Sequence, residues 1–228
     1  MKKIEPPPGY PPEEGRYLRG NDYSPVAVVI ILIHPAEEIP RGIEVLVKTG
    51  VESGAALSGT LQTENIGLEK LICNIVANPN IRYLVLAGPE SPGHFTGEAL
   101  IALFKNGIDQ KKRIIGTKSP APYLFNIPAQ DVERFREQVT LVNLLNEGDS
   151  DVIRKAVWSC YQEKPTQFRS YSLYDPGAYP AKPISRKITW RVTRPHIEPK
   201  DENERKQVEK LKEMMANIKK RVKTKKQQ

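Results

Sequence analysis

The chain reads Tyr83-Leu-Val-Leu-Ala87 and continues with Gly88-Pro-Glu-Ser-Pro-Gly-His-Phe-Thr-Gly97. The first run is short, apolar and rich in residues that favour β-structure, so it predicts a buried strand. Apolar residues recur at helical spacing from Glu98 to Asn106, and Gly107 predicts the end of that helix. The stretch therefore predicts a strand, a glycine-rich loop that carries His94, and a helix. In open α/β sheets, ligands bind beyond the carboxyl ends of the strands, which is where this histidine is expected.

The glycine-rich loop lacks the two common nucleotide-binding patterns. Gly88 and Gly93 have the spacing of a P-loop, but His94 and its neighbour stand where Lys and Ser or Thr would bind phosphate and magnesium. The G-x-G-x-x-G dinucleotide pattern is also absent. What remains is His94-x-x-Gly97. It is similar to the His-x-x-Gly of one group of cobalamin-binding modules, which usually carry Asp where this chain has Pro92.

A longer set of motifs recurs in one order along the chain. It comprises Thr63-Glu-Asn-Ile-Gly-Leu-Glu-Lys70, Asn74-Ile-Val-Ala-Asn-Pro-Asn-Ile-Arg82, the His94 loop, Ile115-Gly-Thr117, Asn126-Ile-Pro128 and Val132-Glu-Arg-Phe135. With these motifs, about residues 20 to 160 resemble the A subunit of tetrahydromethanopterin S-methyltransferase. The resemblance implies a Rossmann-like α/β domain that carries a corrinoid, with His94 as the axial ligand to its cobalt.

The resemblance also implies a function, that of a cobalamin-binding methyl carrier. Such a carrier accepts a methyl group from a methylated pterin on cobalt(I) and passes it to a thiol or another acceptor. Soluble methyltransferase partners are expected to supply the donor and the acceptor.

Two other functions stay open, because a loop histidine taken alone is more often a hydrogen-bonded surface residue than a metal ligand. The first is a cofactor-free binding or assembly protein on the same α/β scaffold. The second is an enzyme that uses His94 as a general base, oriented by Glu90 or Glu98.

Several other residues are expected near the cofactor. Thr63, Glu64 and Asn65 precede the apolar-periodic segment Leu68–Ala77, where they can cap a helix or point polar groups into the crevice. Glycines let a backbone approach a bulky corrin, or serve turns. The expected cofactor-binding residues are His94, Gly93, Gly97, Gly88, Thr63, Glu64, Asn65, Gly67, Gly116 and Thr117.

Gly116 and Thr117 follow a possible short strand at Arg113–Ile115 and are expected to line a pocket for the nucleotide tail of the cofactor. His34 follows the predicted strand Val26–Ile33 and is the second histidine candidate for the crevice.

The predicted fold class is α/β, with a Rossmann-like open sheet that is mostly parallel and has helices on both faces. The unbroken apolar run Val26–Ile33 favours this sheet, and Ile43–Val47 is the next expected strand. Apolar spacing predicts helices over Gln130–Asn146 and Ser150–Glu163. A small C-terminal β appendix is expected from two strands, Tyr171–Tyr174 and Lys187–Val192, joined through Asp175-Pro-Gly.

The expected domain organisation has four parts. A proline-rich arm is expected over residues 1–20, the corrinoid-binding domain over 21–165, the β appendix or linker over 166–198, and a basic amphipathic helix and tail over 199–228. Tyr10 and Tyr17 of the arm are expected to pack on the core.

The positive charge of the chain is concentrated at its C-terminus. Of the 35 Lys and Arg and 27 Asp and Glu residues, 11 and 5 lie within residues 200–228, which leaves 24 and 22 for the rest. The folded part is nearly neutral, so the high isoelectric point does not predict a nucleic-acid partner. The basic helix is expected to dock on its own core, on a partner or on an anionic surface.

No segment approaches the roughly 20 apolar residues that cross a bilayer, and no signal peptide is visible. We therefore expect a cytoplasmic, stand-alone carrier without a transmembrane anchor, although the resemblance implies a C-terminal membrane-spanning helix in the complex-bound protein. Cys73 and Cys160 fit neither a disulfide framework nor a zinc motif and are expected to be buried thiols.

Overall fold

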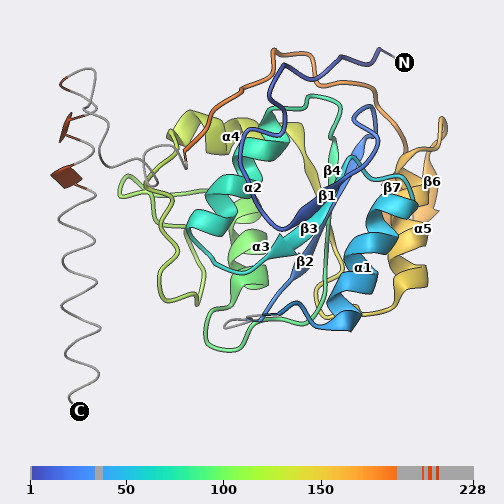
Figure 1. Ribbon diagram of the computed structural model, residues 1–228, viewed down its shortest axis with the longest axis horizontal. Coiled ribbons are helices and arrows are strands. Elements are labelled where there is room, and N and C mark those ends of the chain that lie inside the picture. The colour runs from blue at the N-terminus through green and yellow to red at the C-terminus, as the bar shows by residue number, and fades with distance from the viewer. Residues whose placement is uncertain (1, 34–37, 189–201, 203–204, 207–208, 211–228) are drawn as a thin grey trace. The chain divides into compact units, whose positions relative to one another are not determined.

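Unbroken apolar runs form the centre of a five-stranded sheet in the computed structural model, which describes residues 2–33, 38–188, 202, 205, 206, 209 and 210 (Figure 1). The sheet consists of β1 (Tyr17–Arg19), β2 (Val26–Ile31), β3 (Leu57–Leu61), β4 (Tyr83–Ala87) and β5 (Thr140–Asn143) in the order β1-β3-β2-β4-β5. In this sheet β1 pairs with β3 antiparallel, and the pairs β3–β2, β2–β4 and β4–β5 are parallel. Every residue of β2 and β4 is buried, as expected for parallel strands that are covered on both faces.

Helices cover both faces of the sheet (Figure 1). Even-numbered residues of β2 pack into one layer and odd-numbered residues into the other, because successive side chains of a strand point to opposite faces. The first layer contains α1 (Arg41–Glu52) and α5 (Ser150–Cys160), and the second contains α2 (Ile66–Val76), α3 (Thr96–Asn106) and α4 (Ala129–Gln138). The predicted open, mostly parallel α/β sheet is confirmed.

The strand predicted at Ile43–Val47 is wrong, because these residues lie within α1. The buried positions of α1 include Ile43, Leu46, Val47 and Gly50, a spacing of three and four that places them on one side of the helix. A short apolar run does not distinguish the two structures, and Pro40 directly before α1 is a helix-start signal.

The helix predicted over Gln130–Asn146 ends early, at Gln138. Val139 is extended, and the following residues form β5, which pairs with β4 in parallel. Gln138 explains the change of direction. Its buried side-chain amide donates to the backbone carbonyls of Ile75, Asn78 and Ile81 at 3.2, 2.9 and 3.1 Å, so it ties the end of α4 to the segment before β4.

The predicted β appendix exists with a different partner. β7 (Tyr171–Leu173) pairs with β6 (Thr166–Phe168) in a tight antiparallel hairpin. Of its expected partner Lys187–Val192, residues 187 and 188 are not in a strand and the others lie outside the described residues. The strand expected at Arg113–Ile115 is reduced to isolated bridges in a loop.

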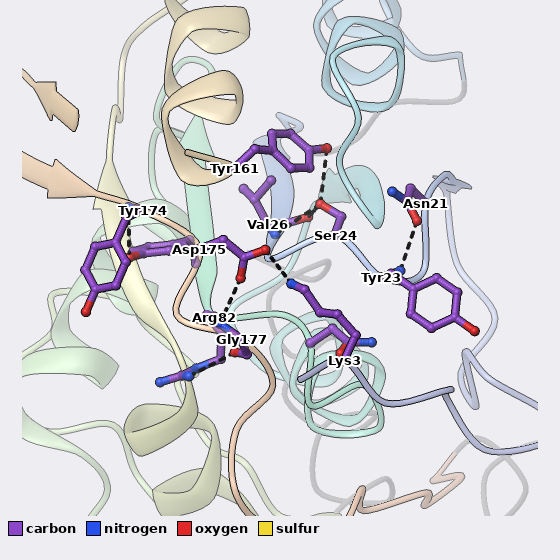
Figure 2. A network of polar contacts seen from close by, with 12 residues as sticks. Lys3, Asn21, Tyr23, Ser24, Val26, Arg82, Tyr161, Tyr174, Asp175 and Gly177 are labelled. Carbon is purple, nitrogen blue, oxygen red and sulfur yellow. Dashed lines mark hydrogen bonds and ion pairs between the residues drawn. The ribbon is translucent and has the colours of Figure 1, made fainter. Parts of the chain in front are cut away.

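The N-terminal arm and the segment after β7 meet at the amino ends of the central strands (Figure 2). Lys3 forms an ion pair with the buried carboxylate of Asp175 at 2.6 Å. Ser24, just before β2, donates a hydrogen bond to the Tyr161 hydroxyl at 3.2 Å. Arg82, just before β4, donates to the carbonyl of Gly177 at 3.2 Å. These contacts cover the amino edge of the sheet.

Other expectations for the ends of the chain have mixed outcomes. Tyr10 is buried and Tyr17 packs against the same core, as predicted. The described residues of the C-terminal unit, which are 202, 205, 206, 209 and 210, are helical, whereas its predicted apolar face lies outside the described residues. Within the described part of the chain, no helix is long and apolar enough to cross a bilayer.

Both cysteines are buried free thiols, as predicted. Burial raises the pKa of Cys73 to about 12 and also raises the pKa of Cys160. Neither is therefore a thiolate at neutral pH.

Replacing Asp175 by Ala is expected to lower the free energy of unfolding by about 1–3 kcal/mol, because it removes the partner of the half-buried Lys3 ammonium and the acceptor of the Gly177 amide. Urea denaturation measures the change. The control is Glu52→Ala, which removes an exposed pair with Lys48 and is expected to stay within about 0.5 kcal/mol of the wild type. Equal effects of the two changes would contradict the role given to Asp175.

Candidate functional site

The candidate site lies at the carboxyl ends of β2 and β4, which are parallel neighbours. The chain leaves β2 toward β3 and leaves β4 toward β5, so the two connections diverge, and this is the place where open α/β sheets bind ligands. Gly88, the first residue after β4, passes close to β2. A Cβ atom there would lie 2.9 Å from Cγ2 of Ile30 and 3.2 Å from the backbone nitrogen of Ile31, and its φ is +85°. Only glycine fits this position.

Glu90 anchors the loop that follows Gly88. Its carboxylate accepts hydrogen bonds from the backbone N–H groups of Gly97 and Glu98, at 3.0 and 2.7 Å, in the first turn of α3. It also accepts one from Ser91 N–H at 2.7 Å. A carboxylate in this place satisfies amides that the helix leaves unpaired and faces the positive end of the helix dipole. Glu90 therefore fixes the loop to α3.

His94 projects from a turn that Ser91 closes. The Ser91 carbonyl accepts hydrogen bonds from the N–H groups of His94 and Phe95 at 3.3 and 2.9 Å. The Ser91 hydroxyl accepts one from Thr96 N–H at 3.3 Å. Phe95 has a left-handed backbone with φ of 52°. Such a conformation is unfavourable for a residue with a side chain and persists only where its surroundings enforce it. The backbone of His94 is thus held on both sides.

Glu64 holds the imidazole of His94. This residue lies in the loop after β3, and its side chain is only 3% exposed. Its Oε2 lies 3.4 Å from Nδ1 of His94, whose side chain is 39% exposed. A carboxylate at Nδ1 favours the neutral tautomer that carries its proton there, with the ring lone pair on Nε2. The pair is therefore suited to present Nε2 to an electrophile or a metal.

The carboxylates expected to orient His94 have other partners. Glu90 caps α3, and Glu98 accepts hydrogen bonds from the Thr117 hydroxyl and from Lys118 N–H. Glu64 contacts His94, so this third carboxylate is also placed to orient the imidazole. The sequence predicts Glu64 as a residue of the crevice, but not in this role.

The other expected residues of the β3 loop cap α2. Asn65 accepts a hydrogen bond from Ile66 N–H at 2.7 Å, and the Thr63 hydroxyl accepts from Gly67 N–H at 3.0 Å. These bonds confirm the capping expected for this loop. The loop lies beside the His94 turn, because Glu64 contacts the imidazole.

The remaining expected residues divide into near and distant ones. Gly93 is next to His94 and faces open space, whereas Gly97 packs so closely that a Cβ atom would lie 2.5 Å from Cδ1 of Leu145. Gly116 lies against Asn106, the last residue of α3. His34 lies outside the described residues.

A cavity of about 320 Å³ lies next to this site, between α2 and the sheet. Thr63 and Gly67 line it, and so does the segment Glu14–Tyr17 of the N-terminal arm. The sequence does not predict this segment near the site, because it is distant in the chain and carries no recognisable motif.

Comparison with known proteins gives consistent results. Residues 3–174 match the family model that describes the A subunit of tetrahydromethanopterin S-methyltransferase. The chain is 41% identical over 174 residues to the A 1 subunit of this enzyme from Methanothermobacter marburgensis, which covers 76% of this chain and 68% of the relative. It is 38% identical to the A 2 subunit from Methanothermobacter thermautotrophicus over 189 residues, which are 82% of this chain and 91% of the relative. The A subunit from Methanopyrus kandleri is 41% identical over 186 residues, which are 81% of this chain and 68% of the relative.

Replacing Glu90 by Ala is expected to lower the free energy of unfolding by about 1–2 kcal/mol, because three backbone amides lose their acceptor. It is also expected to speed hydrogen exchange at the Gly97 and Glu98 amides, which NMR measures. Glu133→Ala is the control, since Glu133 pairs with Arg136 on the surface of α4. Unchanged exchange in the Glu90 variant would contradict the anchoring role.

Proposed function

Because this chain belongs to the family of the A subunit of tetrahydromethanopterin S-methyltransferase, we propose that it binds a corrinoid in the crevice beside His94. As a corrinoid carrier, it would accept a methyl group from a methylated pterin and pass it to a thiol or another acceptor. The observation that carries the proposal is the pairing of His94 with the buried Glu64 at the carboxyl edge of the sheet.

The residues at this edge fit a corrinoid. A corrin supplies the equatorial nitrogens of its cobalt, so the protein needs to provide only one axial ligand, and the geometry favours Nε2 of His94 for that role. Gly93 leaves open space beside the imidazole. Ile33, after β2, and Ile66, the first residue of α2, expose 45% and 43% of their surfaces and offer apolar contacts to a macrocycle.

The chemistry of methyl transfer belongs to the bound corrinoid. The residues of this chain position it. The Glu64 carboxylate favours the tautomer of His94 that has its proton on Nδ1 and its lone pair on Nε2, while Glu90 and Ser91 fix the backbone that carries the ring. Groups that activate the methyl donor and the acceptor would come from partner methyltransferases.

Replacing His94 by Ala tests the axial ligand. The wild-type protein, incubated anaerobically with cobalamin and freed of excess cofactor, is expected to retain corrinoid absorption bands. In the variant these bands should shift toward those of a water-ligated or four-coordinate corrinoid, because the imidazole is gone, while the far-ultraviolet circular dichroism stays the same. Identical spectra would remove His94 from the axial position.

A folded wild-type protein that retains no corrinoid would contradict the proposal as a whole. That outcome would favour a cofactor-free binding or assembly protein on the same scaffold.

Replacing Glu64 by Gln tests the positioning of the ring. The variant is expected to bind cobalamin roughly 10–100-fold more weakly, because the neutral amide supports the Nδ1 proton less well than a carboxylate. Spectrophotometric titration measures the dissociation constant. Glu44→Gln, on the exposed side of α1, is the matched control. If both variants bind like the wild type, Glu64 does not position His94.

A further inference from the structure

The connection between α3 and α4 begins with a strongly basic segment (Figure 1). Residues 105–118, which we call the basic loop, contain five Lys or Arg residues and one acidic residue, Asp109. The other residues of the range 1–199 contain 19 Lys or Arg and 21 Asp or Glu. The excess of positive charge in this range therefore lies on the basic loop.

The exposed lysines of the basic loop have no acidic partner within the part of the chain that the structure describes. None of the ion pairs there includes the exposed side chains of Lys105, Lys111 or Lys118. The carboxylate of Asp109 accepts hydrogen bonds from the backbone N–H groups of Lys111 and Arg113 at 2.8 and 2.9 Å, so it closes a turn. The three ammonium groups are therefore available to a partner.

The backbone that carries these lysines is held in place. Lys112 differs from its neighbours, because its Nζ donates to the carbonyls of Phe125 and Ile127 at 3.0 and 2.7 Å. The buried carboxylate of Glu69 on α2 accepts from the backbone and side-chain N–H groups of Asn126 at 2.6 and 2.7 Å. A surface that is ordered in this way loses little conformational entropy when a partner binds.

The basic loop returns along α3 toward the candidate site. Asn106, the last residue of α3, donates from Nδ2 to the carbonyl of Ile115 at 2.9 Å. Lys118 N–H then donates to the carboxylate of Glu98 at 3.2 Å, in the first turn of α3. Eight residues of helix separate these two contacts, a length of about 12 Å at 1.5 Å per residue. The basic loop thus reaches from the end of α3 to a residue only four positions after His94.

Apolar and aromatic groups accompany the charges. Ile115 exposes 43% of its surface. The half-buried rings of Tyr123 and Phe125 stack, with their centroids 5.0 Å apart, and the backbone of Arg113 bridges to that of Tyr123. Arginine and aromatic residues are enriched in protein–protein interfaces. The mixture favours a protein partner over a nucleic acid, which requires contacts to a regular array of phosphates.

We propose that the basic loop is a docking surface for an acidic surface of a partner methyltransferase. The inference rests on the proposed function, because a partner that reaches the corrinoid has to cover the edge of the sheet where the loop ends. A typical interface covers about 800 Å² of each protein, enough to include both this edge and the lysines. The C-terminal residues 200–228 are not the occupant, since they carry a net charge of +6, with 11 Lys or Arg against 5 Asp or Glu.

The first test uses a short oligoglutamate peptide as the probe, added to protein labelled with nitrogen-15 at low salt. The amide signals of residues 105–118 are expected to shift as the peptide is added. The shifts should vanish in about 1 M salt, where the Debye length falls to about 3 Å. Shifts confined to residues 200–228, or spread evenly over every exposed lysine, would overturn the docking surface.

The second test reverses the charges. The combined variant Lys105→Glu, Lys111→Glu and Lys118→Glu should bind the peptide at the basic loop at least about tenfold more weakly, because three attractive contacts become repulsive. The same three changes to Gln, which only remove the charges, should give a smaller loss. They also provide the test if the first variant fails to fold.

The matched control reverses three exposed lysines elsewhere, in the combined variant Lys48→Glu, Lys155→Glu and Lys164→Glu. These residues lie on α1, on α5 and just before β6. The control has the same net charge as the first variant and should bind the peptide at the basic loop like the wild type. Equal losses in the two variants would show a response to net charge alone and would overturn the proposal.

Two other occupants are outcomes of the test. An oligouridylate of the same charge that binds the loop more tightly than oligoglutamate would assign the surface to a nucleic acid. A wild-type dimer in sedimentation that the charge reversal dissociates would assign it to a second copy of this chain. Either result would overturn an acidic methyltransferase as the partner.

Cobalamin binding, measured on the same preparations, keeps the two proposals apart. A protein that binds oligoglutamate at the basic loop but retains no cobalamin contradicts the carrier function, and with it the identity given to the partner. A protein that retains cobalamin but shows no shifts at residues 105–118 overturns the docking surface alone.

Discussion

The parallel pairing of β2 with β4 is the constraint on which the site depends. Their carboxyl ends lie side by side, and the chain leaves them in opposite directions. Gly88 has to pass within van der Waals distance of Ile30, which directs the following loop across the end of the sheet. The neighbouring loop after β3 reaches the same edge, and there Glu64 meets His94. At the opposite edge, the arm and the segment after β7 cover the amino ends of the same two strands.

The polar residues of the two loops have separate tasks. Glu90 and Ser91 bind backbone amides, so they fix the position of the turn. Thr63 and Asn65 do the same for α2. Glu64 differs, because its buried carboxylate contacts a partly exposed imidazole. Burying a charge is unfavourable unless a partner compensates it, so a buried carboxylate favours the conformation in which its partner stays beside it. Such a contact holds the imidazole in one orientation before a ligand binds.

Local patterns predicted those parts of the fold that depend on neighbouring residues. The strand at Tyr83–Ala87, the His94 loop and α3 follow from apolar periodicity and glycine positions. β3 was missed because Leu57-Ser-Gly-Thr-Leu61 has few apolar residues, and β5 was missed because its apolar residues continue the helical spacing of α4. The pairing of Glu64 with His94 and the cavity between α2 and the sheet depend on the order of the strands, which no local pattern contains.

The most direct test of the account is the electron paramagnetic resonance spectrum of the cobalt(II) corrinoid on protein labelled uniformly with nitrogen-15, with unlabelled cofactor. The unpaired electron reports the nuclear spin of the axial nitrogen. If His94 is the ligand, the triplet splitting seen on unlabelled protein becomes a doublet, and His94→Ala abolishes the doublet. A triplet that persists on labelled protein would show that the ligand is the base of the cofactor itself, which would contradict the axial role of His94.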